Sequence, residues 1–367
     1  MDRVLARGLA DSAFPGAIAI IGDKAGDLVE AAVGHLDWAP SPVPDGHTMW
    51  DMASLTKVIG PTTAIMQLSD EGKIDIDAPV QRYLPTWIGP GKDRVTVRHL
   101  LTHTAGLPAF KAYDLITTDP DSMAVLMFGT PLDTLPGVRM VYSDIGGYLL
   151  GRLVQAISGE TLDHYTVAHI FLPLRMYDTM FRPPDSLIAR IAPTEFDPKR
   201  GGLVRGKVHD ERAYYLGGVS GHAGLFSSAD DLSRFARMLM NGGTLDGTRI
   251  VRAATIARFT AFADSTFSNR ALGWQKPVIR GMRFSTSAPW AGTTMSTASY
   301  GHTGFTGTSI GIDPVHNVYV ILLTNRVDPT RTNNRVGAVR VALTNAVLSV
   351  LSPRPLGPSR PSHPPPP

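Results

Sequence analysis

The chain has no cysteine at all, which excludes disulfide bonds, a cysteine nucleophile and thiolate metal sites. It also has little excess of charge of either sign, because the formal net charge is only +3 over 367 residues. Its Lys and Arg residues are scattered among Asp and Glu, whereas a nucleic-acid-binding surface needs clustered basic residues. We therefore expect no nucleic-acid partner, and the redox compartment stays open.

Long hydrophobic runs are missing as well. Apolar stretches such as 318–323 are too short to cross a bilayer, so we expect no transmembrane segment. The N-terminus, Met1-Asp-Arg-Val-Leu-Ala-Arg, lacks the apolar core of a signal peptide. As written, the chain reads as a cytoplasmic protein, or as a periplasmic or secreted one if a leader was removed. The compartment and the oligomeric state stay unknown at this stage.

What the chain does contain is enough apolar material for a large core, since 43% of its residues are hydrophobic and 18% are charged. Near the N-terminus, the apolar runs 17–21 and 28–33 flank a turn-like segment and predict a β-hairpin. Near the C-terminus, the runs 308–312 and 318–323 predict a second hairpin around Asp313-Pro-Val-His-Asn.

Helical periodicity fills the rest of the pattern. A short helix is predicted within residues 1–12, and a longer one at 335–351. A helix should also start at Ser54 and stop near Gly72, with a kink or an irregular first turn at Pro61. Further helices are predicted at 97–101, 145–157 and 229–240.

Strands at both ends and helices between them predict an α/β (α+β) fold, with an antiparallel sheet formed from both chain ends, flanked by helices, and an inserted all-helical domain. We expect a single catalytic unit over residues 1–352, with its α/β part at about 1–60 and 265–352 and its helical part at about 61–264. The proline-rich tail 353–367 has almost no apolar bulk and is predicted to be disordered.

Ser54 and Lys57 form the only SxxK motif in the chain. Three residues apart on a helix, the two side chains lie on one face and within reach of each other. A neutral lysine beside a serine hydroxyl can accept its proton and leave a nucleophilic alkoxide. A serine at a helix N-terminus is also an ordinary cap, and about one SxxK is expected by chance in such a chain, so the motif needs support from elsewhere.

Two later motifs supply that support. Tyr142-Ser143-Asp144 precedes a predicted helix and can aim a hydroxyl and a carboxylate into a cleft, although Asp144 could instead cap the helix. His302-Thr303-Gly304 precedes the second hairpin, where a glycine lets a substrate approach the backbone closely, although a plain β-turn would also explain the triplet.

In this order, SxxK, a tyrosine motif and a KTG-like triplet resemble the plan of the serine β-lactamase and penicillin-binding-protein superfamily. The resemblance is to its class C-like branch, which includes family VIII carboxylesterases, D-aminopeptidases and carboxypeptidase-like enzymes, and it covers roughly residues 1–352. Two longer runs are also typical of this branch: Val97-Arg-His-Leu-Leu-Thr-His-Thr-Ala-Gly-Leu-Pro108 and Gly221-His-Ala-Gly-Leu-Phe-Ser-Ser-Ala-Asp-Asp-Leu232.

The resemblance implies a role for each motif residue. Ser54 would be the acylated nucleophile, Lys57 would shuttle its proton, and Tyr142 would act as general base. The backbone N–H groups of Ser54 and Phe305 would form the oxyanion hole. The substrate-binding residues would be Asp144, which could instead orient Lys57, together with His302, Thr303, Gly304 and Phe305.

Two departures from the usual pattern bear on the substrate and the base. His302 stands where β-lactamases usually carry lysine, which removes a fixed charge that would help to bind the carboxylate of a β-lactam. Asp144 stands where asparagine is common, and its charge should favour the charged form of Lys57. We therefore expect Tyr142 to take more of the proton transfer and efficient β-lactamase activity to be less favoured.

Three other interpretations compete with this one. Gly307-Thr-Ser-Ile-Gly311 fits GxSxG, but its Ser309 is followed by a strand rather than by the helix of a nucleophile elbow. His209-Asp210-Glu211 could suggest metal ligands, yet adjacent residues do not converge on one ion, and a polar loop near the cleft mouth fits better. His103 and His222 are interpreted as structural hydrogen-bonding residues.

The third alternative is a non-catalytic penicillin-binding or sensor module, which would be expected to lose the nucleophile, the lysine or the tyrosine. Because all three are present, we predict a serine hydrolase without metal or cofactor that forms an acyl-enzyme at Ser54. Its substrate would be a small ester or peptide-like amide, of the carboxylesterase or D-amino-acid peptidase type, with a β-lactam as the alternative.

Overall fold

The computed structural model describes residues 1–351, and its centre is a five-stranded antiparallel sheet. The strand order is β10-β11-β12-β1-β2, so strands from the two ends of the chain pair at the middle of the sheet. There, Ile20 of β1 lies opposite Ile321 of β12. This arrangement confirms the predicted fold class and both predicted hairpins. The strands are β1 (Gly16–Gly22), β2 (Asp27–Gly34), β10 (Tyr300–Thr303), β11 (Ser309–Asp313) and β12 (Val318–Thr324).

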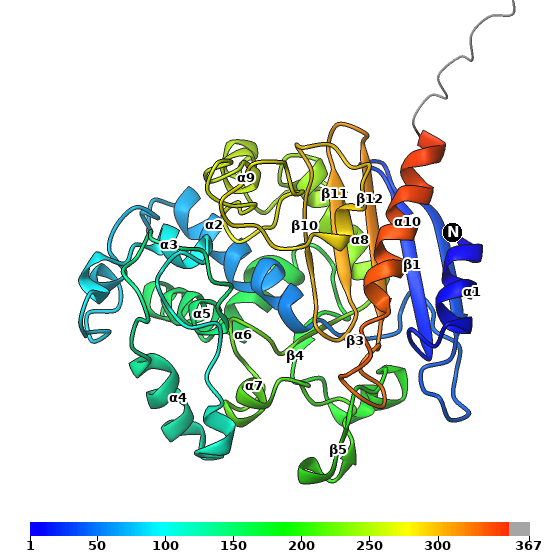
Figure 1. Cartoon of the computed structure of the whole chain (residues 1–367), viewed down its shortest axis with the longest axis horizontal. Coiled ribbons are helices and arrows are strands. Elements are labelled where there is room, and N and C mark those ends of the chain that lie inside the picture. Colours follow the sequence, from blue (N-terminus) through cyan, green and yellow to red (C-terminus); the bar gives the residue numbers. More distant parts are fainter. Residues whose placement is uncertain (352–367) are drawn as a thin grey trace, which may run out of the picture.

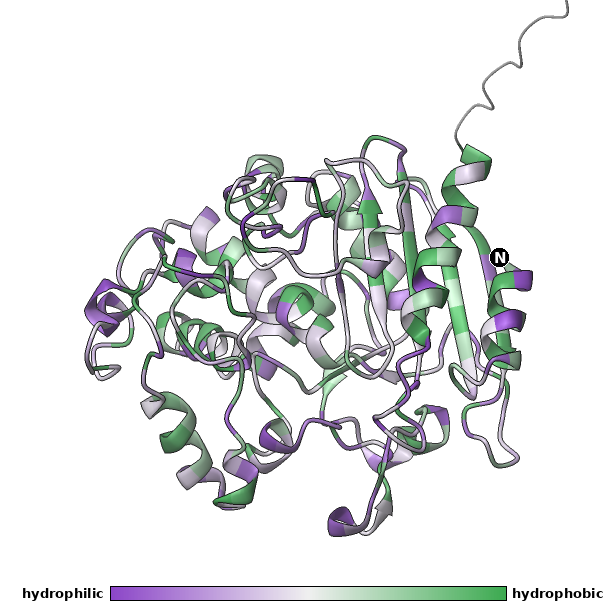
Figure 2. Ribbon diagram, viewed as in Figure 1, coloured by the Kyte–Doolittle hydropathy of each residue, from purple (hydrophilic) through white to green (hydrophobic). Residues whose placement is uncertain are grey.

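Helices cover both faces of this sheet. The terminal helices α1 (Asp2–Ala10) and α10 (Val336–Leu351) lie over one face, and α8 (Ala229–Met240) packs on β1 and β12 from the other (Figure 1). Successive side chains of a strand point to opposite faces, so Ala19 joins the core under α1 and α10, while Ile20 joins the larger core. A sheet buried on both faces needs continuous apolar strands, and β1 and β12 are buried throughout. Figure 2 shows these strands largely in green, the colour of hydrophobic residues.

The remaining helices form the part of the molecule beside the sheet (Figure 1). The segment around Ser54 begins as a short 3-10 turn and passes through a π-helical turn that contains Pro61. It becomes a regular α-helix only at Thr63, which confirms the predicted irregular first turn. The predicted helices at 97–101, 145–157 and 229–240 are confirmed. The helices beyond α1, α8 and α10 are α2 (Thr63–Asp70), α3 (Val97–Leu101), α4 (Pro120–Gly129), α5 (Asp144–Ser158), α6 (Leu162–Thr166), α7 (Glu211–Tyr215) and α9 (Ala253–Thr260).

A second, three-stranded sheet was not predicted from the sequence. Its strands are only two or three residues long, in the order β3-β7-β4, and β3 ends three residues before Ser54. Such short strands have no alternating pattern for sequence analysis to detect. The short strands are β3 (Trp50–Asp51), β4 (Met180–Phe181), β5 (Phe196–Asp197), β6 (Gly202–Leu203), β7 (Leu225–Ser227), β8 (Thr244–Leu245) and β9 (Thr248–Arg249).

The division into an α/β part and a helical part stays a prediction. Helix α8 falls inside the range predicted as helical, 61–264, yet it packs on the central sheet. The predicted disordered tail, 353–367, lies outside the described residues. Within residues 1–351, no helix is both long enough and apolar enough to cross a membrane.

Candidate active site

The turn that carries Ser54 is held by hydrogen bonds to β7, to the loop of His209 and within the turn itself. Met52 donates its N–H to the carbonyl of Leu225 in β7 at 2.9 Å. The buried carboxylate of Asp51 accepts the N–H of Ala53 at 2.8 Å and that of His209 at 2.6 Å. Burial raises the pKa of Asp51, and the two N–H donors oppose this. The turn is therefore fixed by β7 and by the His209 loop, and the half-buried Ser54 stands at the start of its helical segment.

Lys57 lies one helical turn after Ser54 and is 3% exposed. Its ammonium group donates to Ser54 Oγ at 3.1 Å, to Asp144 Oδ1 at 2.9 Å and to the carbonyl of His222 at 2.9 Å. Burial alone would lower the pKa of Lys57, but the charge of Asp144 and the hydrogen bond to it outweigh this effect and raise that pKa above its usual value. Lys57 is therefore charged at neutral pH and lies within hydrogen-bonding distance of the serine.

Asp144, the first residue of α5, bridges two cations. Its second carboxylate oxygen accepts a hydrogen bond from Arg212 at 3.0 Å, and Arg212 also donates to Asp210 at 2.7 Å. Although burial raises the pKa of Asp144, the positive charges of Lys57 and Arg212 hold it below its ordinary value. With both oxygens engaged, Asp144 orients Lys57. The predicted alternative, that Asp144 caps α5, is wrong, because the Ser143 side chain is the cap.

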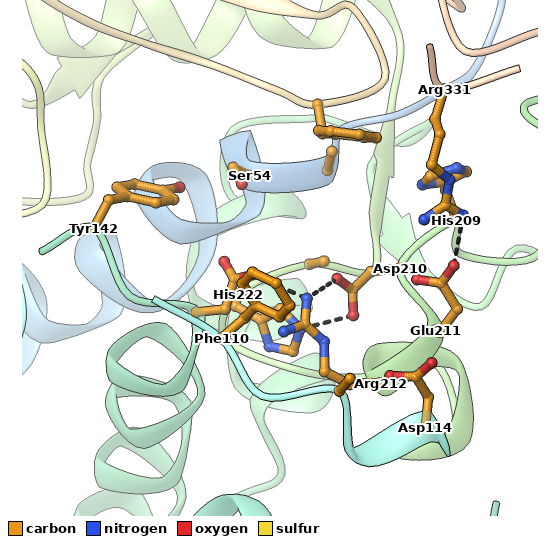
Figure 3. A pocket seen from close by; sticks show the side chains of 15 residues that line it. Ser54, Phe110, Asp114, Tyr142, His209, Asp210, Glu211, Arg212, His222 and Arg331 are labelled. Carbon is orange, nitrogen blue, oxygen red and sulfur yellow. Dashed lines mark hydrogen bonds and ion pairs between the residues drawn. The ribbon is translucent and has the colours of Figure 1, made fainter. Parts of the chain in front are cut away.

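Tyr142 lies just before α5, and its hydroxyl points toward Ser54 (Figure 3). That hydroxyl is buried and has no hydrogen-bond partner among residues 1–351. The Lys57 ammonium lies 5.0 Å from the centroid of the tyrosine ring. The hydroxyl is therefore not engaged by a competing partner, which suits a group that exchanges a proton with the serine or with a bound substrate.

The triplet His302-Thr303-Gly304 runs along and just past the end of β10, so the alternative of a plain β-turn is wrong for its first two residues. A Cβ atom on Gly304 would lie 2.5 Å from the carbonyl oxygen of Met52, which means that glycine is needed for the triplet to pack against the serine turn. His302 is buried, and burial together with Arg270 and Lys57 lowers its pKa to about 3. The histidine is therefore neutral.

Phe305 follows the triplet and borders the cleft with a half-exposed ring. Its ring stacks on His209 at 5.7 Å between centroids, and its carbonyl accepts a hydrogen bond from Arg326 Nε at 2.7 Å. These contacts orient the peptide that follows Phe305. The oxyanion hole from the N–H groups of Ser54 and Phe305 stays a prediction.

Two lobes of one cleft meet at Ser54, Tyr142 and Phe305. The first, called here the acidic lobe, has a volume of about 400 Å³ and contains the side chains seen in Figure 3. The second, called the arginine lobe, has a volume of about 440 Å³. Acidic lobe residues besides the shared three include Phe110, Asp114, Asp144, His209, Asp210, Glu211, Arg212, His222 and Arg331. Those of the arginine lobe include Arg270, Gln275, Thr286, His302, Thr303, Arg326, Asn334 and Arg340.

The arginine lobe changes the expectation drawn from His302. The triplet itself brings no positive charge, but Arg270, Arg326 and Arg340 line the same lobe, which has no carboxylate among its lining residues. Arg340 donates from α10 to the carbonyl oxygens of Gly304 at 3.0 Å and Thr308 at 2.9 Å, and so supports the triplet from behind. The lobe is therefore suited to anionic groups, which the sequence argument from the triplet did not predict.

Comparisons with known proteins agree with this geometry. The family model described as Beta-lactamase matches residues 1–344. The chain belongs to the Beta-lactamase family. It is a serine hydrolase of the β-lactamase and penicillin-binding-protein type. It is 33% identical over 376 residues to a protein of Bacillus subtilis (strain 168) named N-acetylmuramyl-L-alanine amidase, an alignment that covers 91% of this chain and 83% of the relative.

Solved structures of this β-lactamase family share the fold. A penicillin-binding protein homologue from Caulobacter crescentus superposes with a TM-score of 0.73 at 21% identity, covering 94% of this chain and 96% of that one. A family VIII carboxylesterase gives a TM-score of 0.71 at 21% identity, with the same coverages. Both likenesses confirm the β-lactamase fold and leave the substrate open.

The competing interpretations of individual motifs can now be compared with the β-lactamase-family structure. Ser309 is buried and is the first residue of β11, so it is not part of a nucleophile elbow, where a helix would follow. His209, Asp210 and Glu211 turn to different partners, namely Glu195, Arg212 and Arg331, rather than to one point. Among residues 1–351, no group of three His, Cys, Asp or Glu side chains is placed to hold a metal ion.

The two histidines interpreted as structural do make structural hydrogen bonds. His103 Nδ1 accepts the N–H of Ser143 at 3.1 Å, and burial lowers the pKa of His103 well below its usual value. His222 bonds to Ser220 at 2.7 Å and to Asp210 at 2.9 Å. His222 thereby links the acidic lobe to the loop before β7.

Sequence analysis missed the arginines of the β-lactamase-family cleft. Arg212 lies one residue after the His209-Asp210-Glu211 run, so that run pointed to the right loop, although for a metal rather than for an ion-pair network. Arg270, Arg326 and Arg340 are scattered over 71 positions with no shared spacing, and only the fold brings them together.

Proposed function

We propose that this chain is a serine hydrolase that forms and then hydrolyses an acyl-enzyme at Ser54. The observation that carries this proposal is the contact of a charged, buried lysine with the serine, 3.1 Å from Nζ to Oγ, beside a tyrosine hydroxyl without another partner. A nucleophile, a proton acceptor and a fixed positive charge thus converge on one point, which is the requirement of acyl transfer.

In the acylation step, deprotonated Tyr142 accepts the hydroxyl proton of Ser54 while Oγ forms a bond to the substrate carbonyl carbon. The charged Lys57 stabilises both the phenolate and the developing alkoxide. The bond from that carbon to the leaving oxygen or nitrogen then breaks, and the leaving group takes the proton from Tyr142. The predicted oxyanion hole of Ser54 and Phe305 N–H groups would hold the carbonyl oxygen during this step.

Deacylation reverses the same proton path with water. Tyr142 accepts a proton from a water molecule as its oxygen bonds to the acyl carbon, and the ester bond to Ser54 breaks. The proton passes from Tyr142 to Ser54 Oγ and restores the free enzyme. In this scheme Lys57 acts as an electrostatic group throughout, because Asp144 keeps it charged.

We propose a small ester or a peptide-like amide as the substrate, of the carboxylesterase or D-amino-acid peptidase type, bound across the two lobes. The presence of Ser54, Lys57 and Tyr142 together argues against a non-catalytic sensor. A β-lactam stays an alternative substrate, and the three arginines of the arginine lobe make it more plausible than His302 alone suggested.

A second candidate is the amide bond between N-acetylmuramic acid and L-alanine. It is favoured by the 33% identity to the Bacillus subtilis relative that is named for this activity. The arginine lobe supports it as well, because N-acetylmuramyl-L-alanine carries a free carboxylate that guanidinium groups bind well.

The test is to incubate the protein with a p-nitrophenyl ester, a penicillin, a D-Ala-D-Ala peptide and N-acetylmuramyl-L-alanine, and to follow turnover and intact mass. We expect turnover of at least one compound, an acyl adduct on Ser54, and loss of both in Ser54→Ala. Ser309→Ala is the control, because this buried strand residue should not be acylated. Turnover that survives Ser54→Ala would overturn the mechanism, and no adduct or turnover with any compound would favour the sensor.

A further inference from the structure

Arg270 is a buried cation with almost no partners. Its side chain is 3% exposed, and its one hydrogen bond runs from Nη2 to Thr286 Oγ1 at 3.1 Å. Nε and Nη1 are buried without an acceptor, and no carboxylate among residues 1–351 forms an ion pair with this guanidinium. Because an unpaired buried charge is costly, we expect a group that becomes negative to lie beside it.

That group is Tyr142. The guanidinium carbon of Arg270 lies 5.1 Å from the centroid of the Tyr142 ring. The hydroxyl of Tyr142 is itself buried and without a hydrogen-bond partner in the described part of the chain. Two unsatisfied groups of complementary character, a buried guanidinium and a buried phenol, therefore lie next to each other at the serine.

None of the other titratable groups packed around Tyr142 supplies a negative charge that could pair with Arg270. His103 and His302 lie 4.4 Å and 5.9 Å from the tyrosine ring between centroids, and the pKa of each is lowered so that both are neutral. Lys57 is the other cation beside the ring, at 5.0 Å from its centroid, and it forms an ion pair with Asp144. Arg270 is thus the cation next to Tyr142 that has no carboxylate of its own.

We propose that Arg270 is a positioning residue that acts through Tyr142, and that it supplies the positive charge which His302 does not bring to this site. Its role is to stabilise the negative charge on the Tyr142 oxygen, so that this oxygen can take the proton of Ser54. This inference deepens the proposed function and rests on it. It makes Arg270, from the loop between α9 and β10, a functional part of the base.

A substrate carboxylate is the other anion that could lie against Arg270, since this residue lines the arginine lobe. Arg270 is the most enclosed of the three arginines, at 3% exposure against 6% for Arg326 and 8% for Arg340. Its guanidinium also lies over the ring of a residue of the same site. A partner that is always present therefore fits Arg270 better than one that comes and goes with substrate.

The experiment measures kcat/KM against pH for a neutral p-nitrophenyl ester, which carries no carboxylate, in the wild type, Arg270→Met and Arg270→Lys. We expect Arg270→Met to move the acid limb of this pH profile to higher pH, because it removes the positive charge whose guanidinium carbon lies 5.1 Å from the centroid of the Tyr142 ring. The rate at neutral pH should fall roughly tenfold per unit. Arg270→Lys keeps the charge and should restore the limb to within about half a unit.

The matched control is Arg283→Met, an exposed arginine of the same loop that stacks on Phe284 and lies in neither lobe. Its acid limb should coincide with that of the wild type. Arg270→Met is also combined with Tyr142→Phe, and we expect it to cause no further shift there. An unmoved acid limb in Arg270→Met, or an equal loss of rate in the Tyr142→Phe background, would overturn the proposal. A rise in KM confined to carboxylate-bearing substrates would overturn it in favour of a substrate anchor.

A direct titration of Tyr142 keeps the test independent of turnover. Phenolate absorbance is followed against pH in the free protein, and subtraction of the Tyr142→Phe spectrum isolates this residue from the other nine tyrosines. We expect the Tyr142 signal to move to higher pH in Arg270→Met and to return in Arg270→Lys; an unchanged signal contradicts the proposal. If the ester is not hydrolysed, the proposed function fails, and this titration still decides whether Arg270 acts on Tyr142.

Discussion

At the scale of single residues, charge decides how the Ser54 site works. The sequence places a lysine three residues after the serine, and that lysine could serve either as a neutral base or as a fixed cation. Asp144 selects the second role, because its carboxylate lies 2.9 Å from the Lys57 ammonium and raises the pKa of that lysine. In the proposed mechanism the proton acceptor is then Tyr142, whose hydroxyl has no hydrogen-bond partner among residues 1–351.

Asp144→Asn tests this assignment. Without the carboxylate the pKa of Lys57 falls, so the charged form is lost at lower pH. We expect the alkaline limb of kcat/KM to move to lower pH. The measurement is the pH profile with a neutral ester. Asp114→Asn removes a carboxylate from the acidic lobe that has no hydrogen bond to Lys57, and should leave that limb in place. An alkaline limb unchanged in Asp144→Asn would mean that charged Lys57 is not required.

At the scale of elements, the site is assembled where three separate segments touch. The serine turn, the loop before α5 and the end of β10 contribute one motif each, and glycine allows the last of these to approach the first. Arg212, on α7, joins two of the surrounding segments because it binds both Asp144 and Asp210. The contacts between elements are therefore short-range and polar, and small changes in volume or charge should disrupt them.

Gly304→Ala is a test of the contact between β10 and the serine turn. The new methyl group would lie 2.1 Å from Thr308 Oγ1 and 2.5 Å from the Met52 carbonyl oxygen, so the triplet must move away. We expect a loss of about 1–3 kcal/mol in the free energy of unfolding, as for other overpacked sites, and a large fall in kcat. Urea unfolding and ester hydrolysis measure the two effects.

The control for Gly304→Ala is Gly129→Ala in α4, where a methyl group would meet no atom within 4 Å. That substitution should be neutral or slightly stabilising, because alanine favours the helix more than glycine does. If both variants behaved alike, the close approach of the triplet to the serine turn would not matter for activity.

Arg212→Met tests the ion-pair network between α5 and α7. It leaves Asp144 and Asp210, two partly buried carboxylates, without their shared cation. We expect a loss of about 1.5–3 kcal/mol in the free energy of unfolding, the range for hydrogen bonds to charged groups. Arg7→Ala breaks an exposed pair with Asp11 and should cost less than about 1 kcal/mol. Equal effects of the two substitutions in urea unfolding would contradict a stabilising network.

At the scale of the whole molecule, the central sheet joins the two ends of the chain, because β1 and β12 pair at its centre. The cleft lies beside this sheet, with His302 in its arginine lobe and His103 packed against the ring of Tyr142. His103 and His302 are buried in the folded protein, and each has a pKa below its usual value. In the unfolded chain they would bind protons near their ordinary pKa, so acid should favour unfolding.

The sign of this effect can be measured. Since the unfolded state binds more protons below about pH 6.5, each buried histidine should remove about 2 kcal/mol of stability between pH 7 and pH 5. The measurement is urea unfolding of the wild type at both pH values, and His302→Gln should lose less stability over this interval. A wild type as stable at pH 5 as at pH 7 would contradict the neutral state of these side chains.

Much of the architecture could be predicted from the sequence, because its signals are local. The two hairpins, the terminal helices and the irregular turn at Pro61 follow from apolar spacing and from turn and proline chemistry within a few residues of each other. The short strands β3 and β7 could not be predicted, since a strand of two or three residues has no periodicity. They matter nevertheless, because they hold the turn before Ser54.

The sequence by itself determined the order of the motifs, the type of nucleophile and the fold, because each depends on residue identities at fixed spacing. The distance from Ser54 to Lys57 is of this kind, since a helical turn sets it. Only the tertiary structure decided the charges around that pair. Asp144 meets Lys57 across 87 positions, and Arg270 meets Tyr142 across 128. A pKa depends on burial and on neighbours in space, and neither can be read from spacing along the chain.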